Sequence, residues 1–270
     1  MDNILLVGNT GVGKSTILNL FGASFAADFS LIDGLTTKTD YVEVKVNGKQ
    51  VRLIDAPGLV EVNDERIAEN AKELTEALTI GGKSGGKYKL VFVYQSNGGR
   101  LLAEDVYTTA KVCKAINHCL DVGLIFNKTD EEHMDKYSNQ ESLSRIAQTL
   151  SKATNGRLSA DHIIALEYRK TSERHTLKPK LLEYIHKLCP DVINEVKPIH
   201  ASVKEISAFV KWMNTVLTVL AATTGVVLTL PLPGGAVLWK EFWTLLGSND
   251  FVKNSHFGSL LSLGGTKAIQ

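Results

Sequence analysis

The stretch Gly8-Asn9-Thr10-Gly11-Val12-Gly13-Lys14-Ser15 follows the apolar run Ile4–Val7 and opens a segment of helical periodicity. It matches the phosphate-loop pattern G-x-x-x-x-G-K-[ST] at every fixed position. Glycines let successive backbone N–H groups turn toward anionic oxygens, and the start of the next helix adds positive potential. Lys14 is expected to reach the β- and γ-phosphates, and the Ser15 hydroxyl to ligate Mg²⁺. We therefore predict a phosphate-binding loop that runs from Gly8 to Thr16.

Around this loop, short β-branched runs alternate with longer segments of helical pattern. The expected strands are Asn3–Gly8, Tyr41–Val46, Val51–Asp55, Leu90–Gln95, Val122–Asn127 and His162–Glu167. The expected helices are Lys14–Ser24, Asp64–Thr79, Ala103–Ile116, Gln140–Ala153 and Pro179–Leu188. Asn47-Gly48 between the second and third strands is typical of a tight hairpin. The other connections are crossovers, so the pattern predicts an α/β fold: a mostly parallel six-stranded sheet with helices on both faces.

Composition narrows the classes of protein to which the chain can belong. Of its 270 residues 44% are hydrophobic, which is enough for a substantial core. The 30 basic and 29 acidic side chains argue against a generically basic nucleic-acid binder, so we expect no nucleic-acid partner. Three cysteines are too few for a disulfide framework or a zinc site, and a reducing, cytoplasmic location is expected.

A second motif, Asp55-Ala56-Pro57-Gly58, ends an expected strand about forty residues after the phosphate-loop lysine. In the pattern D-x-x-G the aspartate holds Mg²⁺ through water, and the glycine N–H binds the γ-phosphate. Upstream, the polar loop Gly34–Thr39 contains three threonines, one of which is expected to close over Mg²⁺ and the γ-phosphate. We favour Thr37 for this role, with Thr36 and Thr39 as alternatives.

A third motif, Asn127-Lys128-Thr129-Asp130, follows the expected strand that begins at Val122. The carboxylate of Asp130 can accept hydrogen bonds from both N1–H and N2–H₂ of guanine, a pair of donors that adenine lacks. Asn127 is expected to reach the far edge of the base, and the stem of Lys128 to cover its ring. The three motifs in this order predict a site for GTP and GDP rather than for ATP.

Residues 3 to 188, with these motifs, resemble a P-loop GTPase of the translation-factor class. Within that class Leu35–Thr39 resembles the V-T-K-T switch segment of the immunity-associated nucleotide-binding (IAN, or GIMAP) GTPases, and Gly99–Asp105 resembles their G-R-F-T-x-E-D box. The resemblance implies a homodimer formed through the nucleotide face and, often, a C-terminal membrane tether. Where that family tends to show Phe-Asn-Asn, this chain has Leu166-Glu167-Tyr168, so Tyr168 either stacks on guanine or ends a strand partly buried.

The residue after D-x-x-G bears on the rate of hydrolysis. Ras-like GTPases place there a glutamine that orients the attacking water, whereas this chain has Leu59. An apolar side chain cannot polarise water, so we expect slow intrinsic turnover with the missing group supplied by a second copy. Arg100 is the candidate finger, the alternative being a surface arginine near the Ala103 helix. The competing hypothesis is a scaffold that binds GTP and assembles with negligible hydrolysis.

The segment Gly81–Lys87 is rich in glycine and lysine but follows a helix rather than a strand, so we expect a flexible linker with no role in nucleotide binding. Beyond Cys189-Pro190 we expect a second region, 190–270, that starts with a long helix from about Ile199 to Leu230. Its segment 212–239 is uncharged. Flanking tryptophans and lysines suit a membrane anchor on an intracellular membrane, whereas five threonines suit a helix that packs on protein.

Overall fold

The computed structural model describes residues 1–26, 36–61, 63–83, 85–96, 101–116 and 120–224. Its strands are β1 (Asp2–Val7), β2 (Asp40–Val46), β3 (Lys49–Asp55), β4 (Lys87–Gln95), β5 (Val122–Thr129), β6 (Leu158–Glu167) and β7 (Asp191–Val192). Its helices are α1 (Lys14–Leu20), α2 (Asp64–Lys83), α3 (Ala103–Ala115), α4 (Gln140–Leu150), α5 (Lys178–Lys187) and α6 (Val203–Thr224). The 3₁₀ helices are η1 (Glu131–Tyr137) and η2 (Thr171–Leu177). The α/β fold and the six predicted strands are confirmed, and β7 adds a seventh.

The strands form a single sheet in the order β2-β3-β1-β4-β5-β6. β2 runs antiparallel to β3, while β3, β1, β4, β5 and β6 pair in parallel. In this register Leu6 of β1 lies beside Asp55 at the end of β3, and Gln95 at the end of β4 lies beside Asn127 of β5. The carboxyl ends of parallel strands share one edge of a sheet, which is where α/β proteins bind ligands. All three sequence motifs therefore meet at one edge.

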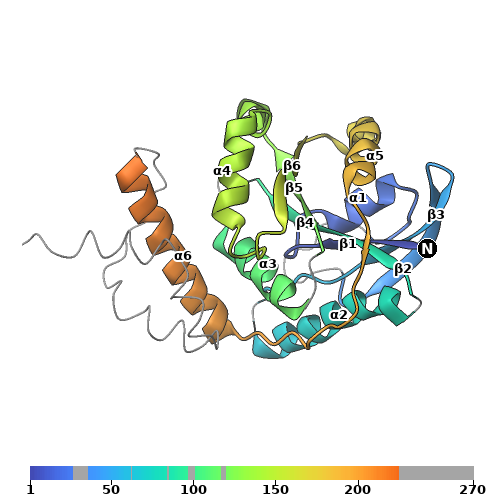
Figure 1. The fold of residues 1–270 in the computed structure, drawn as a ribbon, viewed down its shortest axis with the longest axis horizontal. Helices are drawn as coiled ribbons and strands as arrows, with labels where there is room; N and C mark the ends of the chain where they lie inside the picture. Colours follow the sequence, from blue (N-terminus) through green and yellow to red (C-terminus); the bar gives the residue numbers. More distant parts are fainter. Residues whose placement is uncertain (27–35, 62, 84, 97–100, 117–119, 225–270) are drawn as a thin grey trace, which may run out of the picture. The chain divides into compact units, whose positions relative to one another are not determined.

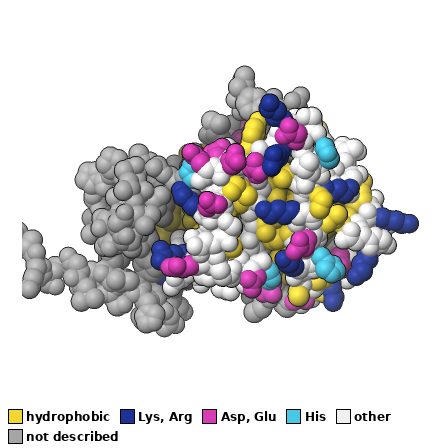
Figure 2. All heavy atoms as spheres, turned by 90° about the horizontal axis from the view of Figure 1, so that it is seen from above, with side chains coloured by type: hydrophobic (Ala, Val, Ile, Leu, Met, Phe, Trp, Pro, Cys, Tyr) yellow, Lys and Arg dark blue, Asp and Glu magenta, His cyan; other side chains and the backbone are white. Residues whose placement is uncertain are grey.

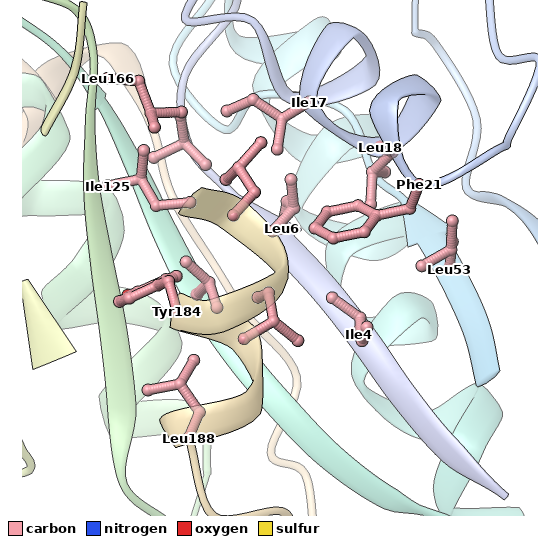
Figure 3. Packing of buried hydrophobic residues seen from close by; sticks show 14 of the residues in the cluster. Ile4, Leu6, Ile17, Leu18, Phe21, Leu53, Ile125, Leu166, Tyr184 and Leu188 are labelled. Carbon is pink, nitrogen blue, oxygen red and sulfur yellow. The ribbon is translucent and has the colours of Figure 1, made fainter. Parts of the chain in front are cut away.

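Helices cover both faces of this sheet, with α1 and α5 on one face and α2 and α3 on the other (Figure 1). Successive residues of a strand point to opposite faces, so Ile4 and Leu6 of β1 pack toward α1 and α5. There they join Ile17 and Leu18 of α1 and Tyr184 of α5 in one buried cluster (Figure 3). This packing fixes α1 against the sheet and so holds the loop between β1 and α1 over the strand ends.

The connection at residues 81–87 differs from the expected flexible linker, because α2 continues to Lys83 and β4 already begins at Lys87. The N–H of Gly81 donates to the hydroxyl of Tyr88 at 2.6 Å. A Cβ atom on Gly81 or on Gly86 would collide with the side chain of Asn3. These glycines are explained by close packing between helix and strand, a cause that the sequence pattern did not reveal.

The chain divides into two compact units, Met1–Ile206 and Ser207–Gln270. The first unit includes the segment 190–206, which is hydrogen-bonded to the preceding elements. β7 pairs with the start of β4, and the N–H of Lys197 donates to the carbonyl of Ala115 at 2.8 Å. The N–H of Ile199 donates to the hydroxyl of Thr75 at 3.0 Å.

The helix predicted for the C-terminal region is present as α6, which begins at Val203 rather than at Ile199 and is described to Thr224. Within the second unit the rings of Phe209 and Trp212 lie 5.6 Å apart. Among the described helices, none combines the length and the apolar character that crossing a bilayer requires. The rest of the predicted segment 212–239, from residue 225 onward, lies outside the described residues.

Candidate functional site

The phosphate loop holds its lysine against its own backbone. The Nζ atom of Lys14 donates to the carbonyls of Gly8 at 2.9 Å and of Asn9 at 3.2 Å. Burial lowers the pKa of Lys14, and the nearby carboxylates of Asp55 and Asp105 oppose that shift. A cation buried among backbone carbonyls at a helix start is placed to meet an anion that enters the loop.

Gly13 has a backbone conformation that the loop requires. Its φ of +98° lies in the left-handed region, and a Cβ atom there would collide with the amide of Asn127. That amide donates from Nδ2 to the carbonyl of Val12 at 2.8 Å, and Nζ of Lys128 donates to the carbonyl of Gly11 at 2.7 Å. The base motif is thus bonded to the phosphate loop, a role for Asn127 and Lys128 that the sequence did not predict.

Asn9 ties the phosphate loop to α3 and to the chain after Gly58. Its Nδ2 donates to Oδ1 of Asp105 at 2.8 Å, and its Oδ1 accepts from the hydroxyl of Thr108 at 2.7 Å. The same oxygen accepts from the N–H of Val60 at 3.4 Å. Burial raises the pKa of Asp105 to about 7, although the hydrogen bond from Asn9 opposes the shift. Sequence reasoning missed this network, because Asn9 and Asp105 lie 96 residues apart.

Three oxygens meet beside the phosphate loop. The hydroxyl of Ser15 donates to Oδ2 of Asp55 at 2.7 Å, and the hydroxyl of Thr36 donates to the same oxygen at 3.2 Å. The other carboxylate oxygen of Asp55, Oδ1, is buried without a hydrogen-bond partner. Burial raises the pKa of Asp55, and the hydrogen bond from Ser15 and the charge of Lys14 oppose that shift. Two hydroxyls and one carboxylate are the hard oxygen ligands that suit Mg²⁺, so these residues fit the predicted metal.

The structure separates the three candidate threonines of this loop, among which the sequence favours Thr37. The hydroxyl of Thr36 lies beside the hydroxyl of Ser15 and the carboxylate of Asp55, whereas Thr37 is exposed. Thr39 is instead bonded to α2. Its N–H donates to Oε2 of Glu73 at 2.7 Å, and its hydroxyl donates to the backbone carbonyl of Glu73 at 2.7 Å. Adjacent threonines in a polar loop give no sequence signal of which one turns inward.

The D-x-x-G motif lies against the phosphate loop. A Cβ atom on Gly58 would collide with the backbone N of Thr10. The carbonyl of Gly58 accepts from Nδ2 of Asn70 at 2.6 Å, and Leu59 is fully buried. Asn70 was not predicted, although a buried polar residue on the apolar face of α2, beside Ile67, Ala71 and Leu74, was a usable signal. The glycine is thereby held with its backbone close to the loop.

The base end of the site is an open hollow beside β5 and β6. It is lined by Gly13, Asn127, Lys128, Tyr168, Arg169 and Arg174, among others. Tyr168 is 57% exposed, and its N–H donates to the carbonyl of Thr129 at 2.9 Å. Arg174 was not predicted; burial and the charge of Arg174 lower the pKa of Lys128. Asp130 is exposed at the start of η1.

Two further site predictions are placed as follows. Thr16, in the first turn of α1, also lines the hollow at the base end. Arg100, the predicted finger, lies outside the described residues. Within the described part of the chain, no cluster of three His, Cys, Asp or Glu residues could hold a metal ion by itself. A cation at Ser15, Thr36 and Asp55 would thus need phosphate oxygens or water to complete its shell.

Comparisons with known proteins agree with this geometry. The model of a family described as 50S ribosome-binding GTPase matches residues 3–155. GTPase Der of Campylobacter lari (strain RM2100) is 32% identical over 144 residues, which make up 52% of this chain and 29% of Der. The chain therefore spans less than a third of that relative's length.

Among solved structures, Era in complex with MgGDPNP and nucleotides 1506–1542 of 16S ribosomal RNA is 19% identical, with a TM-score of 0.46. That likeness covers 78% of this chain and 65% of the Era chain. An Era variant of Aquifex aeolicus bound to GDP and AlF₄⁻ is also 19% identical, with a TM-score of 0.45 over 80% of this chain and 66% of that one. Mg²⁺, the predicted cofactor, is present with GDPNP in the Era complex that contains ribosomal RNA.

These findings correct two expectations. The exclusion of nucleic-acid partners is wrong, because the matched family is described as ribosome-binding and a ribosome is built largely of RNA. The exclusion relied on a net charge of +1, which is a sum over the chain and carries no information on local surfaces. Acidic and basic side chains alternate on the face in Figure 2. The finer resemblance to the IAN GTPases is not supported, since the family model that matches is that of the 50S ribosome-binding GTPases and the curated relative is a Der GTPase.

Proposed function

Because the chain belongs to the 50S ribosome-binding GTPase family, we propose that it is a guanine-nucleotide switch in which Thr36 closes over bound GTP and Mg²⁺. The observation that carries the proposal is the meeting of the Ser15 and Thr36 hydroxyls on one oxygen of Asp55. Ser15 comes from the phosphate loop, Thr36 from the loop before β2, and Asp55 from the end of β3. A γ-phosphate and its metal would join these three segments, and hydrolysis would release them.

Each end of the nucleotide has residues suited to it. Backbone N–H groups of the phosphate loop would surround the phosphates, and Nζ of Lys14 would turn from its carbonyls to the β- and γ-oxygens. Ser15, Thr36 and Asp55 would hold Mg²⁺, which would supply positive charge to the same oxygens. The N–H of Gly58, kept close to the loop by Asn70, would donate to the γ-phosphate.

Guanine would be selected at the base end by Asp130, whose exposed carboxylate can pair with N1–H and N2–H₂. Asn127 and Lys128 contribute in a second way, since their bonds to Val12 and Gly11 hold the base motif in position against the phosphate loop. The aromatic ring of Tyr168 lines the same hollow and offers the base a surface on which to stack.

Hydrolysis would be slow without help, because the fully buried side chain of Leu59 stands where a water-orienting glutamine would be needed. Activation by a second copy, with Arg100 as the finger, stays a prediction on a residue outside the described part of the chain. It is tested by phosphate release per molecule, which would rise with protein concentration. The alternative of a scaffold without hydrolysis gains no support from the family or from the site.

We also propose a ribosomal particle as the macromolecular partner, which the family's description supports. Co-sedimentation of the full chain with ribosomal subunits, in the presence of GDP or of a GTP analogue that cannot be hydrolysed, tests it at two salt concentrations. Binding that depends on the nucleotide and survives physiological salt would support the partner. Equal pelleting with and without ribosomal subunits would refute it.

The switch proposal is tested with Thr36→Ala and with Thr37→Ala as the matched control. Loss of the Thr36 hydroxyl removes a ligand that acts only with the γ-phosphate, so turnover should fall at least about tenfold while GDP affinity is unchanged. Thr37 is exposed, and its variant should behave as wild type. Equal effects of the two substitutions, or a larger effect of Thr37→Ala, would contradict the role of Thr36.

A further inference from the structure

Burial of Leu59 leaves the site without the usual group for the attacking water, and the next polar side chain along the chain is Glu61. Glu61 is half-buried, and its Oε1 accepts a hydrogen bond from the hydroxyl of Thr10 at 2.6 Å. Thr10 belongs to the phosphate loop. A carboxylate that follows D-x-x-G is therefore bonded directly to the loop that holds the phosphates.

This carboxylate lies at the γ-phosphate end of the site. The backbone N of Thr10 is in close contact with Gly58, whose N–H is expected to meet the γ-phosphate. The charge of Glu61 also acts on Lys14, where it opposes the lowering of that lysine's pKa by burial. The hollow at the base end, in contrast, is lined by residues of α1, β5, β6 and η2. Glu61 thus lies beside the phosphate loop and Gly58, and it is not among the residues that line the hollow.

We propose that Glu61 is a catalytic residue that orients the attacking water and accepts its proton, and that Thr10 is the positioning residue that holds Glu61. The proposal rests on hydrolysis of GTP at this site. The water oxygen forms a bond to the γ-phosphorus, and the bond from that phosphorus to the β–γ bridging oxygen breaks. The electron pair of the broken bond stays with GDP, and the water's proton passes to Glu61 and then to the released phosphate.

The chemistry explains why a short hydrogen bond from Thr10 matters. A carboxylate beside a γ-phosphate is repelled by it, so the side chain needs a donor that keeps it in place. The Thr10 hydroxyl is such a donor, and Lys14 supplies a positive charge nearby. With one oxygen held by Thr10, the other oxygen of the Glu61 carboxylate can accept from a water molecule.

The test measures phosphate release in a single turnover, with the full chain in saturating excess over GTP and with Mg²⁺ present, together with GTP and GDP affinity. Glu61→Gln keeps an acceptor oxygen but cannot take a proton, so the rate should fall about 100-fold with unchanged affinity. The rate should fall further in Glu61→Ala. In Thr10→Val the rate should fall about tenfold, because this substitution removes the hydrogen bond to the Glu61 carboxylate but leaves the carboxylate in the protein. Glu65→Gln, at an exposed position in the first turn of α2, is the matched control and should equal wild type.

A rate for Glu61→Gln within about twofold of wild type would overturn the proposal. A faster rate would overturn it as well and would mean that the carboxylate repels the γ-phosphate. A loss of rate that appears only as weaker GTP binding would also contradict it, since a proton acceptor acts on the chemical step. Absence of phosphate release from wild-type protein that binds GTP would refute hydrolysis itself, and the role of Glu61 with it.

Discussion

At the phosphate end of the site the polar side chains are buried and bonded to one another, whereas at the base end they stand half open. Lys14, Asn9 and Asp105 are each at most 9% exposed, and hydrogen bonds or charges connect them. At the base end Tyr168 is 57% exposed and Asp130 is exposed. The two ends are joined through Asn127 and Lys128.

The difference has a physical reason. Phosphates are recognised by fixed backbone N–H groups and one lysine, whose arrangement gains from being formed before the ligand arrives. A base must enter and leave between side chains, so part of the protein surface that contacts it can stay exposed to water before the base binds. We therefore expect changes at the phosphate end to affect both folding and binding, and changes at the base end to affect binding alone.

The largest effect is expected for Lys14→Ala. It removes the cation for the β- and γ-phosphates, so nucleotide affinity should fall at least about 100-fold and turnover should be lost. Fluorescent-nucleotide titration and phosphate release measure both. Lys72→Ala, at an exposed position of α2, is the control. Retention of GTP turnover by Lys14→Ala would remove the basis for assigning the phosphate end.

Asp130→Asn should weaken guanine nucleotides about 30-fold, since an uncharged amide cannot accept from both N1–H and N2–H₂. Xanthine carries an oxygen in place of the 2-amino group, and the amide N–H₂ can donate to it. Affinity for xanthosine diphosphate should therefore rise in the variant, while the melting temperature of the nucleotide-free protein stays the same. Unchanged affinity for guanine nucleotides, or a large loss of stability, would contradict the expectation that changes at the base end affect binding alone.

Asp105→Asn should make the protein more stable above pH 7. Burial raises the pKa of Asp105 from 3.8 to about 7 in the fold, so stability declines as the pH rises through that window and then levels off. The asparagine side chain has no charge to bury, and it keeps an oxygen that accepts a hydrogen bond from Asn9. At pH 8 the free energy of unfolding of the variant should therefore exceed that of wild type by about 2–4 kcal/mol.

Denaturant unfolding between pH 4.5 and pH 8 checks this prediction. The difference between Asp105→Asn and wild type should be small at the acid end and grow with pH. Asp121→Asn, at an exposed position before β5, should show no such growth. A difference that is constant across the pH range, or one that shrinks toward pH 8, would mean that Asp105 is not held neutral by burial.

The smallest effect is expected for Tyr168→Ala. A ring that is 57% exposed gives up only part of a stacking contact, so GDP affinity should fall about fivefold, or by about 1 kcal/mol, with no change in melting temperature. Tyr41→Ala is the matched control, since Tyr41 is 49% exposed on β2 and does not line the hollow. Equal GDP affinity of the two variants would show that Tyr168 only ends a strand.

Much of the fold could be predicted because buried parallel strands are long apolar runs bounded by turns. The expected Leu90–Gln95 and His162–Glu167 are shorter than β4 and β6, because charged or polar residues interrupt the apolar run at the start of both strands. The two residues of β7 have no pattern to detect, since they pair only where the chain passes β4. Tertiary packing also decided the conformation around Gly81.

For the site, sequence spacing predicts the run from Gly8 to Ser15, because backbone geometry sets the chemistry there. Spacing does not indicate which side chain of a polar loop turns toward Asp55, as with Thr36 and Thr37. It was also insufficient for partners distant in sequence, such as Asn9 with Asp105, which the fold alone brings together. Glu61 belongs to this last group, because only its bond to Thr10 reveals where it lies.

We propose that one site, with a preformed phosphate end and an open base end, binds guanine nucleotides with Mg²⁺. Calorimetric titration of the full chain with GDP, GTP and ATP, each with Mg²⁺ and with a chelator, tests it most directly. We predict that GDP and GTP bind with Mg²⁺ and that ATP binds at least about 100-fold more weakly. We also predict that the chelator lowers the affinity for GTP. Equal affinity for ATP and GTP, or a GTP affinity that is the same with and without Mg²⁺, would contradict a guanine-specific site that binds Mg²⁺.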